Sequence, residues 1–161
     1  MVDHVIETGT VIAIPVEDGR FALAQVYRPG VVFYLLIFRI IQDGNYSEED
    51  LSKPAVLGAW TTDGELHRGS WTVLGKSPVR VSGFKEPEYK VVVSGKNLVE
   101  SFDGKSRRPF DESSDRELRN RSSQSSPLVE AAARAYFGYE EWKPLYNKLL
   151  VCDARQPEKS A

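Results

Sequence analysis

Few side chains in this chain could carry nucleophilic catalysis. His4 and His67 are the only imidazoles that could act as a general base, and Ser70 follows His67 by three residues, with Asp63 and Glu65 just before it. A serine nucleophile needs a base within hydrogen-bonding distance and a third group that orients the base. Nearness along one turn does not supply that geometry. We therefore expect His67 to be a solvent-exposed turn residue and the chain not to be an enzyme.

The sequence indicates no metal site and no cofactor site. One cysteine, Cys152, and two distant histidines cannot complete the usual zinc ligand sets, and the acidic turns lack the spacing of a calcium loop. The segment 64–70 has the glycines of a phosphate loop, but no lysine precedes its serine. The residues after it, Trp71-Thr72-Val73, favour a strand over the helix whose amides would hold a phosphate.

Carboxylates gather in three turns and are the candidates for a binding site. They are Glu17 and Asp18, then Glu48, Glu49 and Asp50, then Asp63 and Glu65. Paired carboxylates can do acid–base work, but in turns they are usually only solvated. Three acidic turns on one small domain can form a negative patch. We therefore expect these residues to contact a partner rather than to catalyse.

Length and composition place the chain among ordinary globular domains. It has 161 residues, of which 41% are hydrophobic and 27% charged. A lone cysteine excludes an internal disulfide, and the first residues show neither the basic nor the apolar region of a secretory signal. We therefore expect a cytoplasmic protein.

Neither a membrane nor a nucleic acid is indicated as a partner. The longest apolar run, 31–38, has eight residues, whereas a membrane-spanning helix needs about 20. Residues 1–80 carry 7 basic and 10 acidic side chains and residues 81–161 carry 14 and 13, which gives the net charge of −2. A duplex-binding protein normally has a basic face, and this balance indicates none.

The elements that must position these residues are short strands followed by helices. Strands are expected at 10–16, 20–27, 31–41, 55–61, 71–75 and 89–94, divided by glycine and proline. The third is apolar on both faces, as in the centre of a sheet or a small barrel. Alanines on one face of the second, Ala22 and Ala24, indicate close packing against another backbone. Ser47 and Asp50 have the spacing of a capping box.

The C-terminal part is expected to be helical. Ser126 is the expected N-cap before Pro127, Gly138 is a natural stop, and Trp142, Leu145, Tyr146 and Leu149 have the spacing of a second helix that packs on a core. Trp60, Trp71 and Trp142 are expected in the core, with an interface anchor as the alternative. The fold class is therefore α+β: a β-rich small barrel, or a strongly bent antiparallel sheet, with C-terminal helices packed on it.

A single domain over residues 1–161 is expected from this order of elements. It divides into a β-rich core at 8–95, a polar mobile insert at 104–125, a helical end at 126–150 and a frayed tail at 153–161. The insert is expected to be mobile because Phe110 and Leu118 are its only clearly apolar residues.

The first hairpin carries a family resemblance in the stretch Thr8-Gly9-Thr10-Val11-Ile12-Ala13-Ile14-Pro15-Val16-Glu17-Asp18-Gly19-Arg20-Phe21-Ala22. This stretch resembles the opening of the Immunity protein 26 family of bacterial polymorphic-toxin systems. The segment Gly69-Ser70-Trp71-Thr72-Val73-Leu74-Gly75 is similar to that family's Gly-x-Trp-x-x-x-Gly, and Pro78 follows it. The similarity covers roughly residues 8–95. Ala24 stands where a glycine is expected, and the insert at 104–125 is longer than usual.

The resemblance implies a small cytoplasmic immunity protein that binds a cognate toxin, for example a nuclease, and occludes its active site. It implies no catalytic residues. Two other functions stay open. One is a nucleic-acid-binding small barrel in which Tyr27, Phe33, Tyr34 or Trp71 stacks on bases. The other is a small hydrolase that uses carboxylates or the His67 turn, which requires the acidic groups to converge in one pocket.

Overall fold

The computed structural model describes residues 6–151 of the chain, so the expectations for His4, Cys152 and the tail at 153–161 fall outside the described residues. It divides the chain into two compact units. Unit 1 comprises residues up to Phe84 and from Ser123 onward, and unit 2 comprises Lys85–Ser122. This division differs from the single domain expected from the sequence, because the β-rich core does not extend to residue 95.

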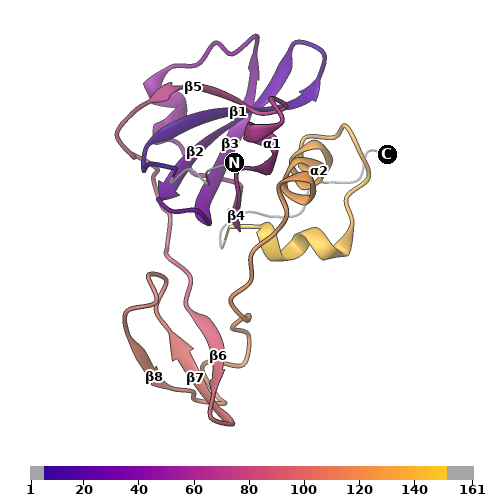
Figure 1. The fold of residues 1–161 in the computed structure, drawn as a ribbon. Coiled ribbons are helices and arrows are strands. Elements are labelled where there is room, and N and C mark those ends of the chain that lie inside the picture. Colours follow the sequence, from indigo (N-terminus) through magenta and orange to yellow (C-terminus); the bar gives the residue numbers. More distant parts are fainter. Residues whose placement is uncertain (1–5, 152–161) are drawn as a thin grey trace. The chain divides into compact units, whose positions relative to one another are not determined.

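Unit 1 is built on a five-stranded antiparallel sheet with the strand order β4-β3-β2-β1-β5. Its strands are β1 (Thr10–Glu17), β2 (Arg20–Arg28), β3 (Phe33–Gln42), β4 (Leu57–Thr61) and β5 (Thr72–Lys76) (Figure 1). All five correspond to strands expected from the sequence. Irregular pairings at Pro15/Glu17, Leu23/Ala24 and Val26/Arg28 bend the sheet.

The centre of the sheet is buried on both faces, as the apolar run predicted. On one face Phe33, Leu35 and Ile37 of β3 join the main hydrophobic core. That core is completed by α2 (Ser126–Tyr136), which packs on β1 and β4, and the small Ala22 and Ala24 of β2 are fully buried in it. Three alanines of α2 (Ala132, Ala133 and Ala135) are buried in the same core. Small side chains on both elements allow the close packing that the alanines predicted.

The other face of the sheet is covered by connecting segments. The 3₁₀ helix η1 (Glu48–Ser52) buries Leu51 there. In the loop after β5, the carbonyl of Ser77 accepts a hydrogen bond of 2.9 Å from Nε2 of the buried Gln25. The Phe84 ring lies 4.8 Å from that of Tyr27. These connecting segments therefore cover this face of the sheet, as α2 covers the other face.

The fold class is confirmed as α+β and β-rich, with a bent sheet rather than a closed barrel. The two edge strands, β4 and β5, do not pair with each other. The edge of β4 is instead occupied by irregular backbone, since Leu57 pairs with Leu150 and Trp60 with Ser123. Covering an edge in this way protects it without closure.

The C-terminal helices differ from expectation in two details. The N-cap of α2 is Ser125, whose hydroxyl accepts from the amide of Leu128, so the prediction of Ser126 was wrong by one residue. The second helix is only the short 3₁₀ segment η2 (Pro144–Leu149), and Leu145 is 46% exposed. A six-residue 3₁₀ segment does not sustain the α-helical stripe that the spacing predicted.

Unit 2 has its own three-stranded antiparallel sheet with the order β6-β7-β8. The strands are β6 (Tyr89–Val93), β7 (Lys96–Glu100) and β8 (Arg107–Pro109). The strand expected at 89–94 therefore exists but begins a separate sheet. Residue 104, where the polar insert was expected to begin, is not a structural boundary either, because β8 pairs with β7 across it. The expected insert at 104–125 thus lies mostly in unit 2, and its last residues, from Ser123, lie in unit 1.

None of the helices in residues 6–151 combines the length and the hydropathy that crossing a membrane would require.

Candidate partner-binding site

Two of the three acidic turns lie at the same end of the unit 1 sheet. Glu17 ends β1, and Asp18 forms the β1–β2 turn together with Gly19, whose φ of +74° is one that glycine adopts without strain. The amide of Asp43, just after β3, donates to the carbonyl of Gly19 over 2.9 Å. This bond places the chain that leads to Glu48 beside the hairpin turn. We call the set Glu17, Asp18, Asp43, Glu48, Glu49 and Asp50 the acidic end.

The second turn is held by the capping box that its spacing predicted. The Ser47 amide donates to Asp50 Oδ2 over 3.0 Å, and the Asp50 amide donates to the Ser47 hydroxyl. Asp50 also pairs with Nη1 of Arg39 at 2.8 Å. Burial acts to raise the pKa of the Asp50 carboxyl, but the Ser47 bonds and the Arg39 charge outweigh it and hold the pKa below its usual value. Asp50 is therefore an ionised residue that positions this turn.

An open depression of about 520 Å³ lies beside Asp50 of the acidic end. Its lining is mainly polar and comprises Arg20, Arg39, Ile40, Ile41, Gln42, Asn45 and Asp50. The Arg20 guanidinium is held in place by Tyr139, because its Nη1 donates to the Tyr139 hydroxyl over 3.2 Å. Two guanidinium groups and two carboxamides make the depression rich in hydrogen-bond donors. It can accept a polar or acidic side chain from a partner.

Most carboxylates of the acidic end already face a cation. Glu48 pairs with Arg80 at 3.2 Å, Glu49 with Lys53 at 3.3 Å, and Glu17 lies 3.9 Å from Arg20. The side chains of these pairs are between 48% and 77% exposed. Such exposed pairs contribute little to stability. A partner's cations can therefore replace them, although the local field is weaker than the sequence suggested.

The third acidic turn lies elsewhere. β3 and β4 are antiparallel and Phe33 pairs with Thr61, so Asp63 follows β4 at the end opposite Gln42. Glu65, in the short helix α1 (Gly64–His67), is 8% exposed and pairs with Arg68. Its amide donates to the Ser126 hydroxyl over 3.2 Å, which ties α1 to the start of α2. Glu65 is therefore a structural residue, and the three turns do not form one patch.

Ser70 is not held by His67. His67 is exposed, and the Ser70 hydroxyl donates instead to Oε1 of Glu130, at a long 3.4 Å. The same Glu130 oxygen accepts from Nε1 of the buried Trp71 over 3.1 Å. Glu130 was missed by the sequence analysis because nothing in its helix distinguishes it from a solvated glutamate. In residues 6–151 no three His, Cys, Asp or Glu side chains are grouped so as to hold a metal ion.

The aromatic residues suggested for base stacking are mostly inaccessible. Phe33 is fully buried, Trp71 is 2% exposed and Tyr34 is 6% exposed. Tyr27 is half-buried against Phe84. Of the three tryptophans, Trp71 is in the core as predicted, whereas Trp60 and Trp142 are half-buried.

No family model, curated protein or solved structure matches this chain.

Proposed function

We propose that this chain is a bacterial immunity protein that binds a cognate toxin and occludes its active site in the cytoplasm. The resemblance of residues 8–22 and 69–75 to the Immunity protein 26 family supports this proposal. The acidic end is the surface proposed to make the contact. We place Asp63 outside the interface, because it follows β4 at the opposite end of the sheet, and Glu65 outside it as well, because Glu65 is buried.

The observation that carries the proposal is that hydrogen bonds hold two acidic turns beside each other at one end of the unit 1 sheet. The amide of Asp43 bonded to Gly19 fixes their separation, and the Ser47 capping box fixes the second turn. A preformed surface loses less conformational entropy when it binds than a mobile one, which favours tight inhibition. Connections held by a rigid sheet are also where binding residues concentrate.

The acidic end would serve binding in two steps. Exposed carboxylates, such as Asp18 and Glu48, attract a basic substrate groove like that of a nuclease and speed the encounter. In the complex, the toxin's cations replace Arg80 and Lys53 as partners of Glu48 and Glu49. The donor-rich depression between Arg20 and Arg39 then receives an acidic or amide side chain of the toxin. This second contact sets the orientation in which the toxin's active site is covered.

Neither alternative function is favoured by an observation on the described residues. Stacking on bases would require exposed rings, and three of the four rings suggested for it are buried. Hydrolysis by paired carboxylates would require convergence, and the depression contains only one of the seven suggested carboxylates, Asp50.

The test uses the toxin encoded beside this gene and charge-neutralised variants. Glu17→Gln with Asp18→Asn, and separately Glu48→Gln with Glu49→Gln, should slow association severalfold at low salt and reduce its salt dependence. The matched control is Asp63→Asn, which removes a carboxylate at the opposite end of the sheet and should leave association unchanged. Unfolding free energies should change by less than about 0.5 kcal/mol in all three variants.

Two results would contradict the proposal in different ways. If the parent protein does not bind the toxin, the immunity function is wrong. If it binds but both double variants associate as fast as the parent at low salt, only the position of the contact is wrong.

A further inference from the structure

The chain passes from unit 1 to unit 2 after Phe84 and returns after Ser122. Within unit 2, the beginning and the end of the segment lie side by side. The amide of Lys90, at the start of β6, donates to the carbonyl of Arg119 over 2.8 Å, and Lys90 forms a parallel bridge with Asn120. Unit 2 is therefore a loop of chain whose two ends meet.

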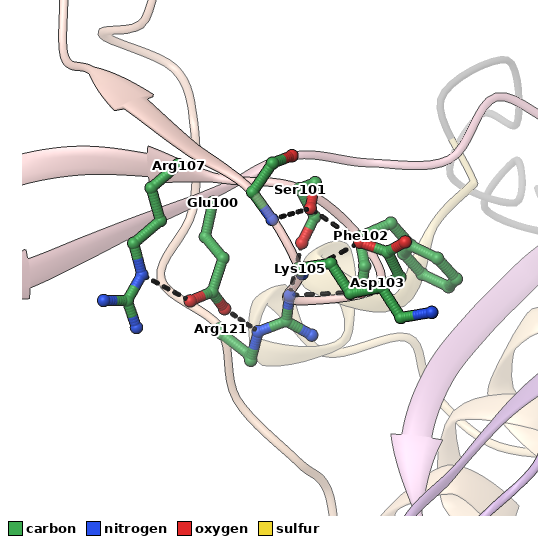
Figure 2. A network of polar contacts seen from close by, with 8 residues as sticks. Glu100, Ser101, Phe102, Asp103, Lys105, Arg107 and Arg121 are labelled. Carbon is green, nitrogen blue, oxygen red and sulfur yellow. Dashed lines mark hydrogen bonds and ion pairs between the residues drawn. The ribbon is translucent and has the colours of Figure 1, made fainter.

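One side chain, that of Arg121, contacts three parts of this small unit, and Figure 2 shows its hydrogen bonds to Glu100, Ser101 and Phe102. Its Nε donates to Glu100 Oε1 at the end of β7 over 2.8 Å. Its Nη2 donates to the carbonyls of Ser101 and Phe102, over 2.7 and 3.1 Å, in the turn before β8. Its guanidinium carbon lies 4.4 Å from the ring centroid of Tyr89, the first residue of β6. Arg121 thus links the last residues of unit 2 to its first strand and to its central strand.

The Glu100 carboxylate, which accepts from Arg121, depends on this hydrogen bond to offset the cost of its burial. Glu100 is 8% exposed, and its other oxygen accepts from Nε of Arg107 on β8 over 3.1 Å. A nearly buried carboxylate that loses one of two guanidinium partners keeps its desolvation cost without full compensation. The same unit has few large apolar residues to replace that contact, with Tyr89, Val99 and Phe102 as its buried ones.

Unit 1 holds its own two ends without using any residue of unit 2. Phe84, the last residue before the crossing, packs its ring 5.9 Å from that of Tyr34. Gln124, just after the return, donates its amide to the carbonyl of Trp60 over 2.7 Å. Tyr34 and Trp60 are themselves in contact, with ring centroids 5.2 Å apart. Both crossings are therefore anchored on one pair of neighbouring aromatic residues in unit 1.

From these contacts we infer that residues 85–122 are an insertion that folds and unfolds as its own cooperative unit, closed at its ends by Arg121. Opening the Arg121 contact releases the ends of β6 and β7 and unfolds unit 2 alone. Unit 1, including the acidic end, stays folded when this happens. The chain is then a complete α+β domain that carries a second unit able to open locally.

Amide hydrogen exchange of the full-length protein, read by mass spectrometry, tests this inference. Arg121→Ala should speed exchange across β6 and β7 by at least about tenfold, since local opening follows the free energy of the contacts that close it. Exchange in β1, β2 and β3 should stay at the parent rate. Arg121→Lys, which keeps the charge but loses the fork that reaches Glu100 and two carbonyls, should give an intermediate increase.

Two controls make the result specific. Arg116→Ala removes an exposed arginine of unit 2 that lies outside the Arg121 contacts, and it should leave exchange in β6 and β7 unchanged. Val129→Ala, in the core of unit 1, should raise exchange in β1 to β3 and leave unit 2 protected. The inference is overturned if Arg121→Ala raises exchange equally in both units, if Val129→Ala does so, or if Arg121→Ala has no effect on unit 2.

Discussion

Arg108 holds Asp115 through two parallel hydrogen bonds, from Nη1 to Oδ2 and from Nη2 to Oδ1, both of 2.8 Å. Asp115 is 3% exposed, and its Oδ2 also accepts from the amide of Asp111 over 2.8 Å. The Arg108 bonds, followed by the Asp111 amide, lower the pKa of Asp115 to about 2. A planar fork matched to a carboxylate is the strongest ion-pair geometry that proteins use. It closes the segment after β8 onto the sheet of unit 2.

This pair predicts an acid-sensitive unit 2. The pKa of Asp115 is lower in the folded chain than the unfolded value of about 3.9, so the pair stabilises fully above about pH 4 and its contribution is lost as the pH falls towards 2. Amide NMR shifts of Leu98 and Val99 measured between pH 5 and 2 should show this loss. Asp115→Asn should remove the part of the pH dependence that comes from Asp115 and destabilise unit 2 at neutral pH. The part from Glu100 remains, because burial acts to raise the pKa of that carboxyl but Arg107 and Arg121 outweigh it and hold the pKa below its usual value. An acid transition identical in parent and variant would show that another carboxyl governs it.

Tryptophan fluorescence provides the internal reference for that titration. Trp60, Trp71 and Trp142 all belong to unit 1, whereas unit 2 contains a single tyrosine, Tyr89. Any change in this fluorescence between pH 5 and 2 therefore reports unit 1, including the Glu130 carboxylate bonded to Trp71, and not unit 2.

The hydrogen bond from Trp71 to Glu130 predicts a second measurable loss. Trp71→Phe keeps most of the buried ring but leaves Glu130, whose side chain is 12% exposed, without its indole donor. The unfolding free energy should fall by about 1–3 kcal/mol in urea titrations. Trp60→Phe, at a half-buried position, is the control and should cost less. Equal losses in the two variants would mean that ring volume, and not the hydrogen bond, sets the cost.

Gly58 predicts a steric effect on β4. A methyl group at this position would collide with the hydroxyl and ring of Tyr34 on β3. Gly58→Ala should therefore lower the unfolding free energy of unit 1 by about 1–3 kcal/mol, the usual cost of overpacking. In a Tyr34→Leu background the same substitution should cost much less. A double-mutant cycle that finds the two changes additive would contradict the collision.

The turn between β7 and β8 is where limited trypsin digestion should cut first. Lys105 is exposed in this turn and Arg107 is exposed at the start of β8, although the Lys105 amide is bonded to Asp103 and the Ser106 amide to the Ser101 hydroxyl. Local opening of a unit with little apolar burial exposes these sites before the sheet of unit 1. Fragments identified by mass spectrometry report the site, and a first cut within β1, β2 or β3 would contradict the expectation.

The sequence by itself determined the features that depend on neighbouring residues. The tight turn at Gly19, the capping box of Ser47 and Asp50, and the end of α2 just before Gly138 all follow from residues within four positions of one another. The buried centre of the sheet followed from a continuous apolar run, because burial on both faces selects apolar residues at every position. These signals predicted the α+β class and the strands of unit 1.

Only the tertiary structure decided to which sheet and which unit each of these elements belongs. The strand at 89–94 was expected to belong to one sheet with the other five, because periodicity describes a strand but does not identify the strand with which it pairs. Arg121 reaches Tyr89, and Glu130 reaches Trp71, over separations along the chain at which no local pattern links the residues. The acidic turns were alike in sequence, yet Glu65 became buried while Asp18 stayed exposed, because burial depends on what packs from elsewhere in the chain. The physical reason is the same in each case: a contact between distant residues depends on the whole packed chain, and only the fold brings them together.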